Sequence, residues 1–421
     1  MFIKKIVLIY FTILGFINAL AGQGQDTSKI NLNFNQGKEI LIKESSLVLS
    51  KYYDISIAEA DLQQRRLWNN PTFVWNADLY SVEHNKYFEF SNQKLIQLEY
   101  VFSVSGKRIK AIKQAKLGID IAKLAYADVI RGIVLEYSLS FTKLSNLIEK
   151  AQIYNTSIAK YELLITSFEK RLSLGLVSES DLVRLKSALI MLRSEASELQ
   201  NEIFTERSNL NTLLNFPPST IITPVQNPFS DINEITYDNA LSVAKEHRPD
   251  FQIAQKNIGF YEQDLKIQKA NAIPDIKIGY QPHDKGSNYV RPYQGMVFEM
   301  GIPIFNRNQG EISKSKIRIE QSKLDLGYFD LKMQNEVQSS VLNYKNSKVN
   351  LLRYSDRHIA ELDKLINDAN SNFERKNISL LQYMDYHQNY IDVRLKYADA
   401  RYEYLNSVNE LNFIVGKEIT N

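Results

Sequence analysis

Two histidines about four residues apart on one helix face can hold a metal ion between their imidazoles. The five histidines are His84, His247, His283, His358 and His387, and none has a second histidine three or four residues away. The chain has no cysteine, which excludes disulfides, thiolate metal sites, cysteine nucleophiles and a lipid-modified N-terminal cysteine. Neither a nucleophile elbow nor a phosphate-binding loop is found. We therefore expect no catalytic centre, no cofactor and no metal site.

Two short turns carry the more informative residues. Gly175 suits a helix end because glycine adopts a positive φ without steric cost, and Ser178 suits the cap of the next helix. Asp181 stands three residues after Ser178, in the capping-box position. Leu176 and Val177 are apolar at this turn, where exposure is unfavourable unless a partner covers them. The segment ends at Leu182, and its counterpart in the second half of the chain comprises Ile378, Ser379 and Leu380. These residues either only separate two helices or also form a docking surface.

The sequence contains an internal repeat, and one of the two turns lies in each copy. WNNP at 68–71 resembles NAIP at 271–274, and LNTLLN at 210–215 resembles LNFIVG at 411–416. The offset is about 200 residues each time, as expected for two copies of one structural unit. The predicted segments are a first repeat at 22–215, a Pro-rich connector at 216–236, a second repeat at 237–416 and a tail at 417–421.

Within each repeat we expect a helix, two strands, a very long helix, a turn and a return helix. The predicted strands are 73–80 and 95–104 in the first repeat, and 275–281 and 296–305 in the second. Each alternates with period two, so that one face is apolar and the other polar. Such strands fit a membrane barrel with lipid outside and water inside, although a half-buried sheet in a soluble domain would show the same pattern.

The long helices are predicted at 107–172 and 310–375, with return helices at 178–215 and 378–415. A stretch of about 66 residues would span about 100 Å as a helix. The first long helix carries a coiled-coil seam with alternating three- and four-residue spacing. The seam residues are Leu144, Leu147, Ala151, Tyr154, Ile158, Tyr161, Ile165, Phe168 and Leu172.

The N-terminus is expected to be a secretory signal peptide at residues 1–21. Lys4 and Lys5 precede an apolar run at 6–17, and a small-residue pattern predicts cleavage after Ala21. The alternative is an N-terminal membrane anchor. The formal net charge of +3 gives no electrostatic case for a nucleic-acid partner.

Four strands cannot close a barrel, and open strand edges are not tolerated in lipid. We therefore predict a homotrimer, because three chains would supply a 12-stranded barrel, which lies within the known range. The predicted fold class is thus mainly α, with a small membrane β-barrel and an α-helical tunnel that are both completed by the trimer.

Over nearly the whole mature chain, the sequence resembles the TolC-like outer-membrane efflux proteins. RLSLGLVSESDL at 171–182 resembles the family's periplasmic turn, RPD at 248–250 its opening of the second repeat, and ADARYEYLN at 398–406 its closing helix. SGKR at 105–108 and IPIFNRNQGEI at 302–312 look most like the CzcC-type branch, which serves heavy-metal efflux pumps.

The resemblance implies a passive exit duct in the outer membrane of a Gram-negative bacterium, with its tunnel in the periplasm. The implied partners are a periplasmic adaptor, which would dock on the turns, and an RND-type inner-membrane pump. In the family, acidic residues line a narrow periplasmic aperture, and the matching residues here are Gln382 and Asp385. Two alternatives stay open, namely a related channel for drugs or proteins and a periplasmic coiled-coil scaffold.

Overall fold

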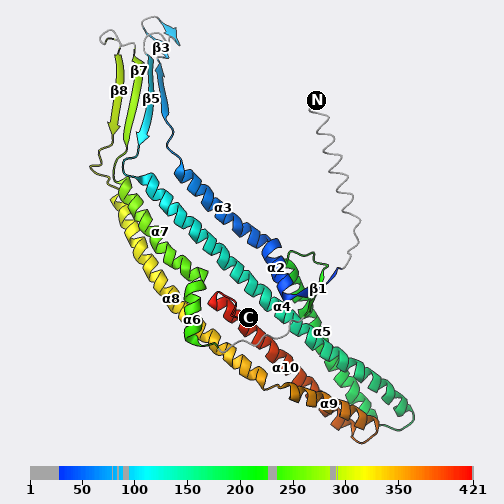
Figure 1. Ribbon diagram of the computed structural model, residues 1–421. Coiled ribbons are helices and arrows are strands. Elements are labelled where there is room, and N and C mark those ends of the chain that lie inside the picture. The colour runs from blue at the N-terminus through cyan, green and yellow to red at the C-terminus, as the bar shows by residue number, and fades with distance from the viewer. Residues whose placement is uncertain are drawn as a thin grey trace. The chain divides into compact units, whose positions relative to one another are not determined.

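The computed structural model describes residues 28–77, 79–82, 85–88, 94–225, 235–284, 291 and 293–419. The predicted leader at 1–21 and its cleavage point after Ala21 lie outside these residues, as does His84. The chain divides into two compact units, and each draws on both halves of the sequence (Figure 1). Unit 1 comprises Met1–Leu49, Ile130–Ala244 and Glu336–Asn421, and unit 2 comprises Ser50–Val129 and Lys245–Asn335.

Unit 2 contains an antiparallel sheet of four strands in the order β2-β5-β7-β8. The strands are β2 (Thr72–Ala77), β5 (Lys94–Phe102), β7 (Ile276–Asp284) and β8 (Tyr293–Met300). The two predicted repeats contribute two strands each, and they meet where β5 pairs with β7. A two-stranded hairpin of β3 (Tyr80–Ser81) and β4 (Lys86–Tyr87) lies between β2 and β5 in sequence.

The register of the sheet gathers apolar side chains on one face. Tyr100 is opposite Ile278, and Ile278 is opposite Phe298, so residues on three strands share that face. On the other face Lys277 is opposite Glu299. The predicted sorting into an apolar and a polar face is therefore realised across neighbouring strands.

The helices of unit 2 carry polar links at their ends. Lys107, the first residue of α4 (Lys107–Ser173), pairs with Asp275 just before β7 at 3.1 Å. Arg108 lies over the ring of Trp68 after α3 (Ser46–Arg66), 3.8 Å from the ring centroid. At the start of α7 (Pro249–Asn271), the buried Arg248 donates to both carboxylate oxygens of Asp250, at 3.0 and 2.6 Å. These links fix where the helices begin.

Unit 1 is a helical bundle with a small parallel sheet. Strand β1 (Lys29–Asn33) pairs with β6 (Ile221–Val225), which lies within the predicted connector. The helices of this unit are α2 (Phe34–Glu44), most of α4, α5 (Glu179–Leu213), most of α6 (Tyr237–His247), the end of α8 (Gln309–Leu352), α9 (Asp356–Glu374) and α10 (Leu380–Val415). Its fully buried side chains include Tyr137, Leu144, Leu185, Leu210, Ile391 and Leu411.

The coiled-coil seam predicted along α4 is confirmed. All nine of its residues are buried or half-buried, and Leu144 and Tyr161 are exposed by only 0% and 2%. None of the described helices has an apolar run long enough to traverse a lipid bilayer.

The prediction of one continuous helix at 310–375 is wrong. The chain forms α8 and α9, separated at residues 353–355. Ser355 adopts an extended conformation, with φ −65° and ψ 147°, and its hydroxyl accepts the backbone N–H of His358 at 3.2 Å. This serine cap starts a new helix, and neither proline nor glycine announces the break, so the sequence offered no strong signal.

Three predicted strands are too long at their helix-proximal or hairpin ends. The strand predicted at 296–305 ends at Met300, because Gly301 weakens it and Pro303 has no N–H to donate to a ladder. The strand at 95–104 ends at Phe102, ahead of Gly106 with φ +69°. The strand at 73–80 ends at Ala77, since Tyr80 pairs with Tyr87 in the separate hairpin.

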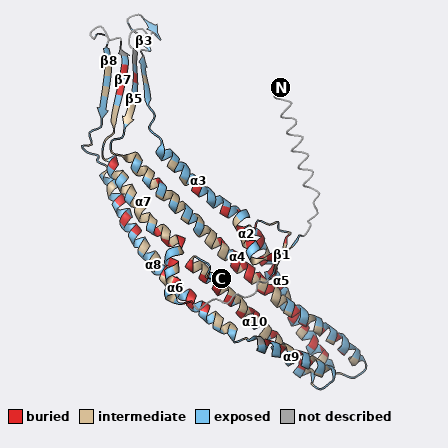
Figure 2. Ribbon diagram, viewed as in Figure 1, coloured by how far each residue is buried: buried red, intermediate tan, exposed pale blue. Residues whose placement is uncertain are grey.

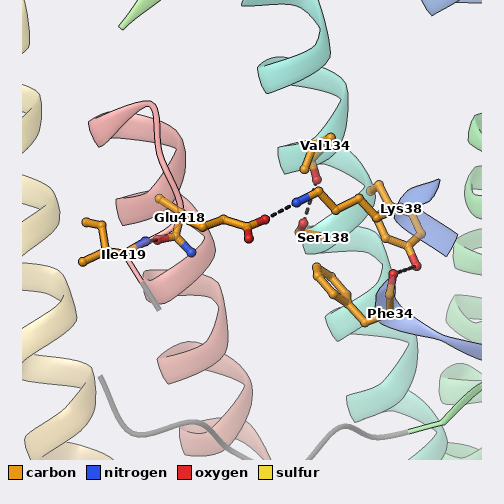
Figure 3. Close-up of polar contacts among 8 residues, drawn as sticks. Phe34, Lys38, Val134, Ser138, Glu418 and Ile419 are labelled. Carbon is orange, nitrogen blue, oxygen red and sulfur yellow. Dashed lines mark hydrogen bonds and ion pairs between the residues drawn. The ribbon is translucent and has the colours of Figure 1, made fainter. Parts of the chain in front are cut away.

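Helix α2 packs tightly on α4 through Gly37. A Cβ atom at Gly37 would lie 2.0 Å from the hydroxyl oxygen of Tyr137, which donates to the carbonyl of Phe34 at 3.0 Å. Figure 3 shows this region, where Lys38 on the same helix also pairs with Glu418 after α10. Only a residue without a side chain allows α2 to approach so closely.

We expect Gly37→Ala to destabilise unit 1 by about 1–3 kcal/mol, because the added methyl group overpacks a buried site. Adding Tyr137→Phe should recover part of the loss by removing the hydroxyl. Gly132→Ala is the matched control, since a Cβ at Gly132 in α4 meets nothing within 4 Å. Urea midpoints followed by circular dichroism measure all three. Equal midpoints for the Gly37 and Gly132 variants would show that the close approach carries no energetic weight.

Candidate functional site

Two turns of unit 1 form the candidate site, and they have the same backbone geometry. After α4, the N–H of Leu176 donates to the carbonyl of Arg171 at 2.9 Å, and Gly175 takes φ +72°. After α9, the N–H of Asn377 donates to the carbonyl of Asn372 at 2.8 Å, and Lys376 takes φ +61°. Both are Schellman endings. Sequence reasoning recognised the glycine but missed Lys376, because lysine rarely adopts a positive φ.

Serine caps open both following helices. Ser178 accepts the N–H of Asp181, and Ser379 accepts the N–H of Gln382, each at 3.2 Å. Only the second turn closes a capping box, in which Oε1 of Gln382 accepts the N–H of Ser379 at 2.9 Å. At the first turn the structure shows only the serine half of the predicted box.

The apolar residues of the turns differ in exposure. Leu176 is 69% exposed, whereas Val177, Ile378 and Leu380 are half-buried and Leu182 is buried. Leu182 therefore supports the first turn from beneath. Two further exposed leucines, Leu174 at 71% and Leu381 at 62%, lie beside these turns and were not predicted. The turns thus present leucine side chains to solvent from capped, well-defined helix ends.

The predicted aperture residues lie one helical turn apart on α10. Gln382 and Asp385 are both exposed. The side chain of Gln382 is engaged in the capping box. Asp385 is the charged residue of this pair.

Beneath the turns, aromatic rings join α4, α9 and α10. Phe168 stacks on Phe373 with ring centroids 6.2 Å apart, and Phe373 stacks on Tyr383 at 4.6 Å. Tyr383 donates its hydroxyl to Asn370 at 3.0 Å, and burial raises its pKa to about 12. The cluster makes the two hairpins one packed body below their turns.

His387 is the least expected member of this cluster. It is fully buried, its ring lies 5.2 Å from that of Tyr161, and neither ring nitrogen has a hydrogen-bond partner among the described residues. Burial, with a smaller contribution from Lys160, lowers its pKa to about 4. The histidine is therefore neutral at pH 7. Among the other histidines, His247 is half-buried and His358 is exposed.

Farther along the bundle, polar contacts connect α4 to α10. Lys150 pairs with Asp399 at 2.9 Å, and Arg401 pairs with Glu149. Thr142 donates to Asn406 at 2.7 Å. Across the described ranges, no group of three acidic or histidine side chains is placed to hold a metal ion.

The apolar face of the sheet in unit 2 is the second candidate site. Its residues are exposed on all four strands, in pale blue in Figure 2 for the most part. The largest exposed side chains on this face are Phe73 at 65%, Trp75 at 55%, Leu98 at 54%, Tyr280 at 48%, Met296 at 78% and Phe298 at 67%. A continuous exposed patch of this kind marks a surface that contacts lipid or another protein.

A sheet of this kind joined to very long helices is the fold of the outer-membrane channels. VceC, an outer membrane protein of Vibrio cholerae, matches with a TM-score of 0.70 over 92% of this chain and 96% of its own, at 12% identity. CusC matches with a TM-score of 0.71 over 94% and 95%, at 15% identity. The MtrE outer membrane channel of Neisseria gonorrhoeae matches with a TM-score of 0.67 over 92% and 89%, at 12% identity.

These likenesses confirm the predicted resemblance to TolC-like channels at the level of the fold. No family model matches the sequence, and no curated protein matches it either. The likeness to the CzcC-type branch stays a prediction.

The buried His387 makes the stability of the helices below the two turns depend on pH. His387 has a pKa of about 4 in the folded chain, below its ordinary value of 6.5, so the unfolded chain binds its proton first. Its contribution to stability is complete above about pH 6.5 and falls by up to about 3 kcal/mol as the pH drops toward 4.

We expect His387→Leu to remove this part of the acid sensitivity, because leucine fills the site without a titratable group. Hydrogen exchange of α9 and α10 amides at pH 7 and pH 4.5, corrected for the intrinsic rate, measures it. The exposed His358 provides the control variant His358→Leu, which should respond to acid as the wild type does. An identical acid response in the His387 variant would contradict this account.

Proposed function

We propose that this chain is the exit duct of a tripartite efflux pump in the outer membrane of a Gram-negative bacterium. It would conduct substrate passively and carry out no chemical step of its own. The observation that carries the proposal is the exposed apolar face of the four-stranded sheet, on a chain with the fold of outer-membrane channels. The two tandem repeats would then each supply one strand pair and one helical hairpin.

The edge strands of the sheet need further strands to pair with. Among the described strands, β2 and β8 are its edges, and each has one neighbour only. In lipid, unpaired backbone groups cost several kcal/mol each, so the edges must pair with other chains. Three copies would join β8 of one chain to β2 of the next in a 12-stranded barrel, with the apolar face toward lipid.

A second seam along α8 supports the homotrimer. Exposed apolar residues recur on this helix at steps of three, four, seven and eleven residues, which keep them on one face, as in a coiled-coil seam without its partner. They are Ile317 at 65%, Leu324 at 76%, Tyr328 at 64%, Leu331 at 60%, Leu342 at 49%, Val349 at 57% and Leu352 at 68%. The seam of α4 is covered by helices of the same chain, whereas this face of α8 is not. A neighbouring chain would cover it in the proposed trimer.

The turns are the proposed docking surface for a periplasmic adaptor, which in turn would contact an RND-type pump. Leu176 projects from a capped helix end, and the first turn of α10 offers Leu381. Asp385 would contribute to a ring of three carboxylates at the periplasmic aperture, which favours cations over anions. The predicted role of Gln382 there is weaker, since its side chain caps α10.

The proposed cargo has two candidate classes. Heavy-metal cations follow from the sequence likeness to the CzcC-type branch, and drugs or proteins are the second candidate. Sensitivity of a deletion strain to zinc, cobalt, cadmium or copper, compared with dyes and detergents, separates the two.

The assembly test is direct. Protein extracted from outer membranes in mild detergent should have the mass of three chains, each of 48.6 kDa less its leader, and should form channels in planar bilayers. It should also stay in the membrane through carbonate and urea washes, from which a periplasmic scaffold would be released. A well-folded monomer would refute the barrel.

The docking turns can be tested separately from assembly. Leu176→Asp with Val177→Asp should abolish export and leave trimer yield unchanged, because Leu176 is exposed and Val177 is only half-buried in the free chain, and the two charges would lose their water fully only under the adaptor. Leu163→Asp is the control, since Leu163 on α4 is 74% exposed but lies away from the turn. Normal export by the double variant would assign these two residues to packing alone.

A further inference from the structure

The polar face of the sheet in unit 2 carries a charged group that spans three strands. Nζ of Lys277 on β7 lies 3.2 Å from a carboxylate oxygen of Glu99 on β5 and 2.5 Å from one of Glu299 on β8. The Glu99 side chain is 13% exposed and that of Glu299 is 63% exposed. We call these three residues the collar.

Gln97 and Gly279 support the collar on the surface of the sheet. Nε2 of Gln97 donates to Glu99 at 2.5 Å, so this carboxylate is bound from two sides. The buried Gln97 lies across Gly279, where a Cβ atom would come within 2.6 Å of its amide nitrogen. The absence of a side chain at Gly279 therefore leaves room for this polar network on the surface of the sheet.

We propose that the collar sets the charge preference of the duct where the strands meet the helices, with Lys277 as its positioning residue. This inference rests on the proposed function, in which the polar face lines the lumen. Lys277 neutralises one carboxylate and draws both toward the wall, which leaves one surplus negative charge per chain and three in a trimer. Because Glu299 is the more exposed carboxylate, it supplies most of the field in the lumen, and the passage favours cations weakly.

The distances support an effect on permeating ions. Charges separated by less than the Debye length of about 8 Å at physiological salt interact with little screening, and low-dielectric walls strengthen the field. A change of one charge per chain is tripled by symmetry. The ratio of local reaction rates for cationic and anionic reagents should therefore change roughly two- to tenfold per charge.

The absence of cysteine from the chain makes a local test possible. Thr72→Cys places a single thiol on the polar face opposite Glu99, and Phe73→Cys places one on the apolar face of the same strand. The measurement is the reaction rate of each thiol with membrane-impermeant cationic and anionic thiosulfonates, on full-length protein in lipid vesicles. This readout is local and independent of the turns.

Three backgrounds vary the collar charge in the Thr72→Cys protein. The net charge of the collar per chain is −2 in Lys277→Gln and zero in Glu299→Gln. It is −1 in the double variant, as in the wild type. The expected ratio of cationic to anionic rates is highest in Lys277→Gln and lowest in Glu299→Gln, with the wild type and the double variant between these two. Equal ratios in all four proteins would overturn the role of the collar.

The Phe73→Cys protein separates this inference from the proposed function. In a membrane barrel, lipid shields its thiol and only Thr72→Cys reacts quickly. If both thiols react at similar rates in vesicles, the apolar face is not in lipid and the proposed function fails with the inference. If Thr72→Cys alone reacts but its ratio ignores the collar, the channel stands and the inference falls.

Discussion

The backbone N–H and C=O groups of the four-stranded sheet must all find hydrogen-bond partners, and this need determines how the strands of the two halves are arranged. Every strand with one apolar and one polar face needs a neighbour on each side when water is excluded. The pairing of β5 with β7 satisfies this need between the two halves of the chain, because each half supplies two strands. In the proposed channel, the edge strands β2 and β8 would pair with neighbouring chains, so that assembly would complete the sheet.

The helical bundle of unit 1 meets a different requirement with different residues. Its seam of leucines and tyrosines on α4 is continuous, and polar contacts such as Lys150 with Asp399 fix the register of α4 against α10. Apolar burial supplies most of the stability in such a bundle, and polar pairs of this exposure contribute little individually. Their value lies in fixing the axial register of α4 against α10.

Periodicity predicted the parts of this fold that depend on side chains alone. The two strand pairs, the seam of α4 and the helix ends near Gly175 and Ser379 follow from alternation, heptads and capping residues. Sequence reasoning failed where the deciding partner is far away in the chain. Strand β1 exists because β6 lies beside it across nearly 200 residues, and the short apolar alternation at 29–33 gives little sign of that. The break at Ser355 and the positive φ of Lys376 involve ordinary residues, so composition could not reveal them.

The candidate site shows the same division. Leu176 and Asp385 were named from the turn pattern and the family resemblance, and the structure shows both exposed. The burial of Leu182 and the engagement of Gln382 depend on helix rotation, which a sequence pattern does not fix. The burial of His387 among aromatic rings depends on the packing of three helices, and its neighbours in sequence did not single it out.

The break between α8 and α9 makes the two hairpins mechanically unequal. Helix α4 runs for 67 residues without interruption, so a load on the first turn is carried along a single elastic rod. At residues 353–355 the second hairpin has a joint, because the helical hydrogen-bond ladder restarts at the cap of Ser355. A force on the second turn would therefore meet a point where rotation about a few backbone dihedral angles can bend the hairpin. The hairpin that contains α4 would therefore be stiffer than the hairpin that contains α9.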